Sequence, residues 1–455
     1  MEPLLAVETG VARLVGAVSR ATGRGGGTTL PGKLLWKVDP GVMSRLARRL
    51  PEGVVLVSAT NGKTTTAAML AGILSRSRTL AWNNSGANLA SGVTSTLLAA
   101  RGARLGVLEV DEFALPEVIR RTQPRVVLLG NLFRDQLDRY GELEHIAERW
   151  RAALAELRAE TTVVVNADDP LVASLAEGRE AVIRYGIDEP RLARPSLQHA
   201  ADSKYCIRCG AAYDYRAAYV GHLGDYRCPA CGHARPPLDV AAAGVVLDGL
   251  DAAELDLRAH DGSVRVRLPL PGLYNVYNAI AAAAVSLALG LSTDEARVGL
   301  EGFQAAFGRF ERIQVGQQEI VLLLIKNPAG ANEAIRTLEH GGVPETLLVA
   351  LNDAIADGRD VSWIWDVDFE PLLERAARIV VSGSRAAELA LRFTYAGFPA
   401  ERLEIEPDLA RALDRTLERA RGAPRVGVLP TYTAMLELRR IATERGLVRP
   451  FWERT

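Results

Sequence analysis

The stretch VLVSATNGKTTTAAML, residues 55–70, changes from a β-branched run to helix-forming residues across one short polar turn. Val54–Val57 has the composition of a buried strand, and from Thr65 onward Ala, Met and Leu recur at helical spacing. The turn Ala59–Thr64 therefore opens a helix, where unpaired backbone N–H groups and the positive end of the helix dipole favour an anion.

This turn is suited to the phosphates of a nucleotide. Lys63 is long enough to reach the outer phosphates, and the Thr64 hydroxyl is a ligand for the accompanying Mg²⁺. The alternative is an ordinary capped helix with an exposed lysine. We expect Lys63 to face solvent before a nucleotide binds. The full P-loop pattern has a glycine where Val57 stands, so the turn is not that of a standard kinase or GTPase. The expected cofactor-binding residues of the turn are Thr60, Asn61, Gly62, Lys63, Thr64 and Thr65.

The composition is that of an ordinary globular protein with several domains. At 455 residues the chain is too long for one hydrophobic core, and its length suggests about three modules. Hydrophobic residues make up 48% and charged residues 24%, and the formal net charge of −1 argues against a general nucleic-acid binder. No apolar run is long enough to span a bilayer, and the N-terminus lacks the features of a secretory signal. We therefore expect a cytoplasmic protein without a transmembrane segment.

All four cysteines fall into one segment, as two C-x₂-C pairs. Four thiolates at this spacing suit a tetrahedral Zn²⁺, and a site closed by four cysteines is structural rather than catalytic. Two disulfides are the alternative, which a reducing cytosol disfavours. The intervening segment is rich in Tyr and Gly, as in a small β-ribbon, and we expect His222 and His233 on the ribbon surface. The expected zinc ligands are Cys206, Cys209, Cys228 and Cys231.

The pattern of strands and helices predicts three parts. Residues 1–50 read as lead-in helices that pack on the next domain, with a membrane-surface helix as the alternative. Alternating strands and helices predict a parallel α/β domain over residues 51–308, interrupted by the cysteine ribbon at about 200–236. A second α/β unit, Rossmann-like, follows over residues 309–455. The predicted strands are Val54–Val57, Leu105–Val110, Val126–Leu129, Thr162–Val165, Ile320–Ile325, Thr346–Leu351, Ile379–Ser382 and Arg425–Leu429.

Polar residues follow each of the first four strands, at the edge where open α/β sheets bind ligands. The phosphate turn follows the first strand, and an acidic group of Glu109, Asp111 and Glu112 follows the second. The third and fourth strands lead into polar segments that begin at Asn131 and Asn166. The sequence therefore predicts the nucleotide site at this edge of the first sheet.

Six motifs occur in the order found in the Mur ligase and folylpolyglutamate synthetase superfamily, and they resemble its pattern along nearly the whole chain. The turn T-N-G-K-T resembles the superfamily's ATP loop, with Ala59 in place of its first glycine. The resemblance implies that Glu109 holds Mg²⁺, that Asn278 lies against the nucleotide and that Arg309 reaches its phosphates. It also implies a Mur ligase-like ATPase domain with an inserted Cys₄ zinc ribbon and a C-terminal α/β domain. The other matching segments are Arg134–Gly141, Asn166–Pro170, Tyr274–Asn278 and Gly308–Arg312.

Each of these motifs also has a simpler reading when it is taken alone. Asn275 is suited to capping a helix, and Asp169 with the following proline is suited to a turn. Arg309 is compatible with an ordinary surface charge. The occurrence of all six in order is what favours the superfamily.

Within the superfamily, three features resemble the MurT family, the synthetase subunits of lipid II isoglutaminyl synthase: the cysteine ribbon and the segments Lys326–Gly330 and Leu351–Asp366. The resemblance implies ATP-dependent amidation of the D-glutamate α-carboxyl of the lipid II stem peptide through an acyl phosphate. Lys63, Glu109 and Arg309 would neutralise charge during this reaction. It also implies a heterodimer with GatD, a glutaminase chain that supplies ammonia, and action at the inner face of the cytoplasmic membrane. Two other functions stay open: an amino acid ligase of the Mur or folylpolyglutamate type, and a non-enzymatic nucleotide-binding regulator.

The resemblance also implies a catalytic role for Asp360. Glutamine hydrolysis usually takes a Cys–His pair, and all four cysteines here are expected to hold metal, so that pair belongs on another chain. In the MurT family a carboxylate of the synthetase subunit completes the pair as a triad, and Asp360 stands at the matching position. The alternatives are that Asp360 caps a helix beginning near Trp363, or that Asp353 or Asp357 has this role.

Overall fold

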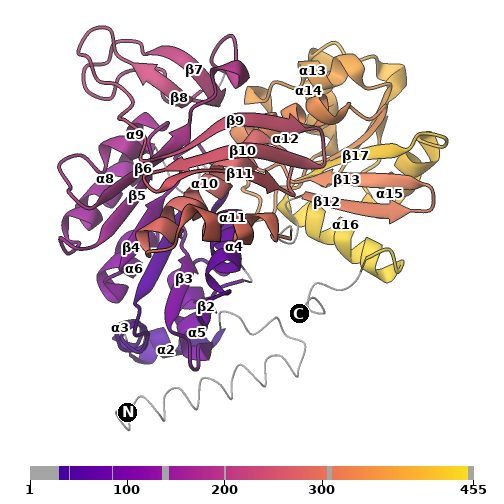
Figure 1. The fold of residues 1–455 in the computed structure, drawn as a ribbon. Helices are drawn as coiled ribbons and strands as arrows, with labels where there is room; N and C mark the ends of the chain where they lie inside the picture. The colour runs from indigo at the N-terminus through magenta and orange to yellow at the C-terminus, as the bar shows by residue number, and fades with distance from the viewer. Residues whose placement is uncertain are drawn as a thin grey trace.

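A computed structural model of the chain describes residues 30–39, 41–84, 86–135, 143–198, 201–304 and 310–448. Within these residues the fold consists of two α/β sheets and a separate two-stranded ribbon (Figure 1). Arg309, most of the motif at 134–141 and most of the predicted N-terminal helices lie outside the described residues.

The first sheet has nine strands in the order β11-β10-β9-β6-β5-β4-β1-β3-β2. All neighbours from β2 to β9 pair in parallel, and β10 and β11 add an antiparallel edge that extends toward the second sheet (Figure 1). The central strands are buried on both faces, which explains their nearly continuous apolar sequences. The strands are β1 (Val54–Ser58), β2 (Leu80–Trp82), β3 (Leu105–Glu109), β4 (Val126–Leu129), β5 (Thr162–Asn166), β6 (Val182–Ile187), β9 (Val240–Asp248), β10 (Ala252–Ala259) and β11 (Gly262–Leu268).

Alternate side chains of these strands enter two different hydrophobic cores. Val55 and Val57 of β1 point into one core. This core also contains residues of the helix after the phosphate turn, of the antiparallel edge of the sheet and of the helices that follow that edge. Val54 and Leu56 point to the opposite face and its helices. The first face carries α4 (Lys63–Leu74), α10 (Leu273–Ala288) and α11 (Thr293–Glu301); the second carries α2 (Leu30–Val38), α3 (Val42–Ala47), α5 (Ala90–Ala99), α6 (Leu115–Thr122), α8 (Leu143–Ala155) and α9 (Pro170–Ser174).

The second sheet has six strands in the order β12-β13-β17-β14-β15-β16, all parallel except the β12–β13 pair. One of its faces shares the large core of the first sheet, so the two units are joined by continuous apolar packing. The strands are β12 (Phe310–Val315), β13 (Gln318–Leu323), β14 (Thr346–Ala350), β15 (Arg378–Ser382), β16 (Leu403–Ile405) and β17 (Arg425–Pro430). The helices are α12 (Pro328–Gly341), α13 (Glu370–Arg375), α14 (Ala386–Tyr395), α15 (Leu409–Arg419) and α16 (Tyr432–Glu444), with the 3₁₀ turns η2 (Ser362–Asp366) and η3 (Ala400–Arg402).

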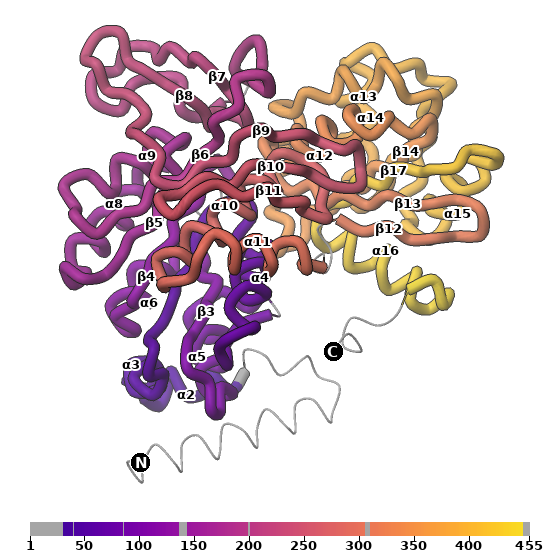
Figure 2. The backbone as a smooth tube through the Cα atoms, viewed as in Figure 1, coloured from indigo at the N-terminus to yellow at the C-terminus, as the bar shows by residue number. Residues whose placement is uncertain are grey.

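The cysteine segment forms a small unit between β6 and β9. Its strands β7 (Asp214–Val220) and β8 (Leu223–Arg227) pair antiparallel and lie at the top of the molecule in Figure 2. The chain enters the unit through the 3₁₀ turn η1 (Pro190–Leu192). The buried carboxylate of Asp168 ties the unit to the sheet: it accepts hydrogen bonds from Arg235 (2.9 Å), from the backbone N–H of Ile187 (2.8 Å) and from the Tyr277 hydroxyl (2.7 Å).

The predicted strands are confirmed, since all eight coincide with observed strands to within two residues. Nine observed strands are not among these eight: β7 and β8 lie in the predicted ribbon, and no range was predicted for β2, β6, β9, β10, β11, β12 and β16. Among the described helices, none is long and apolar enough to cross a membrane.

Candidate functional site

The phosphate turn lies between β1 and α4 and packs directly against α10. Gly62 has φ of +88°, and a Cβ at this position would lie 2.0 Å from Oδ1 of Asn278. Both the backbone conformation and the close approach therefore require glycine. Asn278 also accepts a hydrogen bond from the Thr66 hydroxyl (3.2 Å), which fixes its amide beside the turn. The two segments predicted to bind nucleotide are thus adjacent.

Ala59, which stands in place of the superfamily's first loop glycine, is accommodated by a glycine on the neighbouring strand. A Cβ at Gly130, just after β4, would lie 2.7 Å from the Ala59 methyl. Because β1 and β4 pair side by side, the space released at residue 130 takes up the methyl at residue 59. The turn keeps its close packing with an alanine at this position.

Lys63 is buried, so the expectation that it faces solvent is wrong. Its ammonium group donates to the Ala59 carbonyl and lies 2.7 Å from Oε2 of Glu112, and its side chain is 10% exposed. Burial lowers the pKa of Lys63, but the Glu112 carboxylate and its acidic neighbours raise it, and the net shift is upward. The amine is therefore held protonated inside the loop, against a carboxylate contributed by a different strand end.

Three buried carboxylates lie at the end of β3 near this lysine: Glu109 is the last residue of the strand, and Asp111 and Glu112 follow it. The parallel register pairs Val57 with Glu109, so the end of β3 lies beside the start of the phosphate turn. Asn88 donates to Glu109 Oε1 (3.1 Å) and thereby orients it. Carboxylate and hydroxyl oxygens are the ligands that Mg²⁺ prefers, and Thr64 opens the adjacent first turn of α4.

The second sheet reaches the same turn through two residues after β13. The Lys326 ammonium lies 3.1 Å from the Thr60 carbonyl and 2.6 Å from Oδ2 of Asp135. The amides of Asn327 and Asn61 exchange hydrogen bonds of 3.0 and 3.3 Å. Residues after β13 therefore form hydrogen bonds with the phosphate turn, and Lys326 adds a second cation beside it.

A cavity of about 100 Å³, which we call the junction cavity, lies where the two sheets and the ribbon meet. The phosphate turn forms one side through Asn61 and Gly62, and α10 forms another through Asn278. Its remaining walls are mostly aromatic and aliphatic, including Tyr277 and Phe133. Apolar walls with a few polar groups beside a phosphate site suit the base and sugar of a nucleotide.

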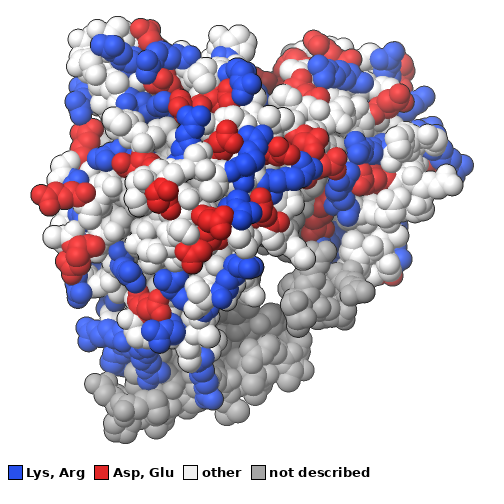
Figure 3. Space-filling view, viewed as in Figure 1, with Lys and Arg blue, Asp and Glu red and all other residues white. Residues whose placement is uncertain are grey.

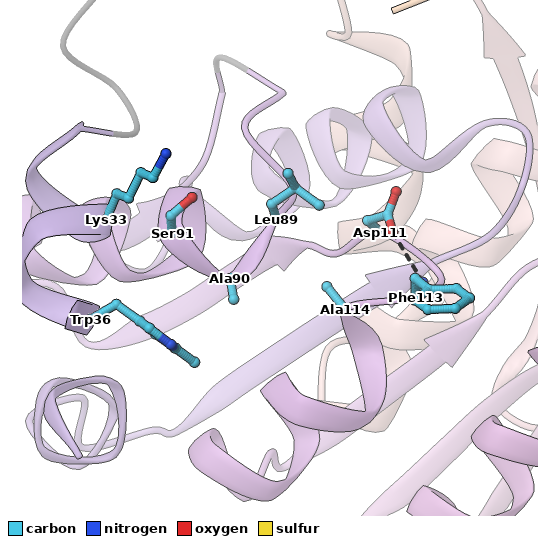
Figure 4. A pocket seen from close by; sticks show the side chains of 8 residues that line it. All are labelled: Lys33, Trp36, Leu89, Ala90, Ser91, Asp111, Phe113 and Ala114. Carbon is cyan, nitrogen blue, oxygen red and sulfur yellow. Dashed lines mark hydrogen bonds between the residues drawn. The ribbon is translucent and has the colours of Figure 1, made fainter. Parts of the chain in front are cut away.

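A second and larger hollow, of about 470 Å³, lies on the opposite side of the acidic group; we call it the α2 groove. Lys33 and Trp36 line it from α2, and Leu89 from the start of α5 (Figure 4). Asp111 and Phe113 close the other side, where the Asp111 carboxylate accepts a hydrogen bond from the Phe113 N–H (3.0 Å). The groove thus combines the cation of Lys33 with apolar surface, and it lies beside the acidic group through Asp111.

The four cysteines form one cluster in which all sulfur atoms lie within 4.8 Å of one another. The pairs Cys206–Cys231 and Cys209–Cys228 are each 3.5 Å apart, and none of the four is in a disulfide. Tetrahedral zinc with bonds of about 2.3 Å would separate its sulfur ligands by about 3.8 Å. Backbone N–H groups of Arg208 and Cys231 also point at the sulfurs of Cys206 and Cys228. The cluster is thus able to hold a metal ion.

Both histidines of the ribbon are buried, so their predicted surface position is wrong. His233 shares a hydrogen bond of 2.6 Å with the Tyr213 hydroxyl inside the small aromatic core of the unit. His222 lies against the Phe133 ring, and its Nε2 is 3.3 Å from Oδ2 of Asp169. The ribbon packs on the sheet at this point, and its turn residue is therefore enclosed.

The three candidate aspartates of the second sheet differ in their partners. Asp353 accepts hydrogen bonds from Ser384 (2.7 Å) and Arg385 (2.8 Å). Asp357 is buried and accepts from the backbone N–H of Thr433 (2.8 Å), at the start of α16. Asp360 is exposed, and it accepts a hydrogen bond from the N–H of Ser362 (2.9 Å).

This hydrogen bond places Asp360 just before η2, whose N-cap residue is Val361 and has no side-chain cap bond, so Asp360 is not the cap of this turn. Hydrogen bonding from Ser362 lowers the pKa of Asp360, which keeps it ionised at neutral pH. Trp365, in the same turn, is 46% exposed and packs edge-on against the exposed Tyr395. An ionised carboxylate thus lies near exposed aromatic surface.

Sequence reasoning did not assign site roles to Glu112 and Lys326. The sequence places Glu112 in an acidic group but does not show its pairing with Lys63, because that pairing depends on the adjacency of β1 and β3. Lys326 follows the end of a predicted strand, and this position was the sequence signal that could have identified it as a site residue. Its contact with the phosphate turn joins two domains and is not visible in local sequence.

Two family models match the chain. The Mur ligase middle domain matches residues 57–220, and the MurT ligase C-terminal domain matches residues 324–435. The first match covers the phosphate turn and the acidic group, and the second covers Lys326 and the three aspartates. Fold and site together define a ligase of the Mur ligase type.

Similarity to characterised proteins extends over nearly the whole chain. The subunit MurT of lipid II isoglutaminyl synthase (glutamine-hydrolyzing) from Streptococcus pneumoniae strain R6 is 34% identical over 431 residues, 93% of this chain and 94% of the relative. The chain belongs to the MurT family.

Solved structures show the same fold at lower identity. A pseudomurein peptide ligase type C from Methanothermus fervidus aligns with a TM-score of 0.66 and 22% identity, covering 88% of this chain and 80% of that one. MurF ligase from Thermotoga maritima in complex with ADP aligns with a TM-score of 0.63 and 16% identity, covering 90% and 84%.

Proposed function

We propose that the chain catalyses ATP-dependent amidation of the D-glutamate α-carboxyl in the stem peptide of lipid II. The observation that supports this most directly is the phosphate turn, where buried Lys63 faces the carboxylates after β3 and Lys326 approaches from the second sheet. The name of the pneumococcal relative supplies the substrate and the use of glutamine. In this proposal residues 51–308 bind ATP, and residues 309–455 complete the site.

The nucleotide would bind with its phosphates on the residues Thr60–Thr65. Backbone N–H groups at the start of α4 and the Lys63 ammonium supply positive charge there. Mg²⁺, held by Thr64 and Glu109, would neutralise the phosphate oxygens. Asn278, fixed beside Gly62, would contact the nucleoside, and Arg309 would approach the phosphates from the domain junction.

The proposed chemistry has two steps. A carboxylate oxygen of the D-glutamate attacks the γ-phosphorus of ATP, the bond to the β–γ bridging oxygen breaks, and ADP leaves. Ammonia then attacks the carbonyl carbon of the acyl phosphate, and inorganic phosphate leaves with the former carboxylate oxygen, giving D-isoglutamine. Phosphorylation supplies the leaving group that a carboxylate lacks, and the chain contributes positioning and charge neutralisation.

The α2 groove is our candidate for the peptide acceptor. It ends at Asp111, in the same acidic group that adjoins Lys63, so a carboxyl group there would approach the outer phosphate. Basic side chains gather over α2 and α3, and they include the exposed Lys37, Arg48 and Arg49 (Figure 3). An anionic membrane surface would attract this end, and we propose that the reaction takes place in the cytoplasm at the inner face of the membrane.

Ammonia would come from a separate glutaminase chain of the GatD type in a heterodimer. All four cysteines of this chain belong to the metal cluster, so none is available as the nucleophile for glutamine hydrolysis. Asp360 is exposed near aromatic surface, and we propose that it orients the partner's catalytic histidine.

Mass spectrometry of lipid II tests the proposed reaction. After incubation with ATP, Mg²⁺, ammonium and the full-length chain, we expect the mass change that corresponds to replacement of OH by NH₂. The proposal would be contradicted if lipid II stayed unchanged in the presence of ATP with either nitrogen source, ammonium or glutamine together with the glutaminase partner. Incorporation of an amino acid instead would identify an amino acid ligase.

We also propose that the metal of the cysteine cluster is zinc with a structural role. The purified chain should contain about one Zn²⁺, and Cys206→Ser or Cys231→Ser should lower the melting temperature, because metal binding supplies the folding energy of so small a unit. Ile207→Ser, at an exposed position inside the first pair, is the control and should leave both zinc content and melting unchanged. Metal analysis without zinc would contradict this proposal.

A further inference from the structure

Glu333 is a buried carboxylate that has no role in the proposed reaction. It lies in the second turn of α12, and its side chain is 4% exposed. Within the described parts of the chain neither of its carboxylate oxygens has a hydrogen-bond partner. Buried charges normally have such partners, because a buried charge without one costs on the order of several kcal/mol.

The neighbouring cation does not satisfy this carboxylate. A guanidinium nitrogen of Arg336 lies 3.9 Å from Oε1 of Glu333, which is too far for a hydrogen bond. The same guanidinium donates to the carbonyls of Tyr219 (2.7 Å) and Leu192 (3.0 Å), so its donors are directed to the ribbon unit. Burial raises the pKa of Glu333, Arg336 and Arg194 lower it, and the net shift is upward.

The unpartnered carboxylate lies in the wall of the junction cavity. The same cavity is bounded by Gly62 of the phosphate turn and by Asn278, so one continuous space connects the turn with Glu333. Tyr274 and Ala334 add apolar surface beside the carboxylate. A nucleotide with its phosphates on the turn would have its nucleoside in this space.

We propose that Glu333 accepts a hydrogen bond from the nucleoside and makes the site selective for the sugar or the base of its nucleotide. The inference rests on the proposed function, since it concerns the same ATP site. Both oxygens of this carboxyl group lack partners and can accept hydrogen bonds, and the donors that a nucleoside offers are its ribose hydroxyls and the exocyclic amine of adenine. Carboxylates commonly accept from ribose hydroxyls in nucleotide sites, and guanine presents an acceptor where adenine has its amine.

Calorimetric titration of the full-length chain tests this role. Glu333→Met removes the acceptor at similar size, and we expect binding of Mg·ATP to weaken at least tenfold while binding of Mg·tripolyphosphate, which has no nucleoside, stays within twofold. The melting temperature should not fall, because a buried charge is replaced by an apolar side chain.

Glu339→Met is the matched control. Glu339 is on the same helix and also lies 3.9 Å from an arginine, Arg375, but it is 26% exposed and does not line the junction cavity. We expect its ATP affinity to stay within twofold of the unsubstituted chain.

Nucleotide analogues identify the donor. If a ribose hydroxyl is the donor, the analogue that lacks it (2′-deoxy-ATP or 3′-deoxy-ATP) binds the unsubstituted chain weakly, and the Met variant no longer distinguishes that analogue from ATP. If the amine is the donor, purine riboside triphosphate, which lacks it, behaves in this way. Unchanged ATP affinity in Glu333→Met, or an equal loss for ATP and tripolyphosphate, would overturn the inference. Failure of the unsubstituted chain to bind any of these ligands would instead overturn the proposed function.

Discussion

Lys63→Ala should reduce ATP-dependent amidation at least a hundredfold, because removing one preorganised charge from a site of charge development costs about that factor or more. It should also lower the free energy of unfolding by about 3 kcal/mol, since Glu112 is left buried without its partner. Turnover is measured by the mass change of lipid II, and stability by urea unfolding. Because the Lys63–Glu112 pair is internal and not on the surface, the substitution affects stability as well as activity.

The double variant Lys63→Ala/Glu112→Gln separates these two effects. With both charges removed, we expect most of the lost stability to return while turnover stays at the level of Lys63→Ala. Recovery of turnover together with stability would mean that Lys63 serves only the fold, and the assignment of the phosphate turn would be wrong. Full turnover in the single variant would have the same meaning.

Asp360→Asn should reduce glutamine-driven amidation at least a hundredfold in the complex with the glutaminase, and leave ammonium-driven amidation within twofold. The asparagine keeps the hydrogen bond from Ser362 but loses the charge that would orient and stabilise an imidazolium. The measurement is the rate of lipid II amidation with each nitrogen source at saturating ATP.

Asp353→Asn is the comparison for this experiment. Its carboxylate is engaged by Ser384 and Arg385 within the second sheet, so we expect no preference between glutamine and ammonium. An equal loss with both nitrogen sources in Asp360→Asn would assign that residue to the fold or to the ATP site. A selective loss in Asp353→Asn would move the triad position to that residue.

The strands that were predictable from sequence are those whose side chains are buried on both faces. β4 consists of valine and leucine alone, and β1 adds only a terminal serine; such short, β-branched apolar runs are typical of strands buried on both faces. β6 contains an arginine and a glycine, and β2 and β16 have only three residues each. These strands exist because a neighbour supplies the hydrogen bonds, and no local pattern specifies that neighbour.

The site divides in the same way. The position of the turn at the start of α4 and the clustering of the four cysteines were predictable because both depend on spacing within one segment. The burial of Lys63 was not, because Glu112 comes from another strand. The enclosure of His222 depends on how the ribbon docks on Asp169, which is a tertiary contact. The local sequence thus specifies the candidate site groups, and tertiary packing determines which residues contact them.

The contact between Ala59 and Gly130 has an evolutionary consequence. Two positions at the ends of neighbouring strands share the room for a single methyl group, so a substitution at one changes which substitutions the other tolerates. An ancestor with glycine at both positions could acquire alanine at either, but the second alanine would then meet the first at 2.7 Å. We therefore expect the two positions to be epistatic, with glycine needed at residue 130 wherever residue 59 is alanine.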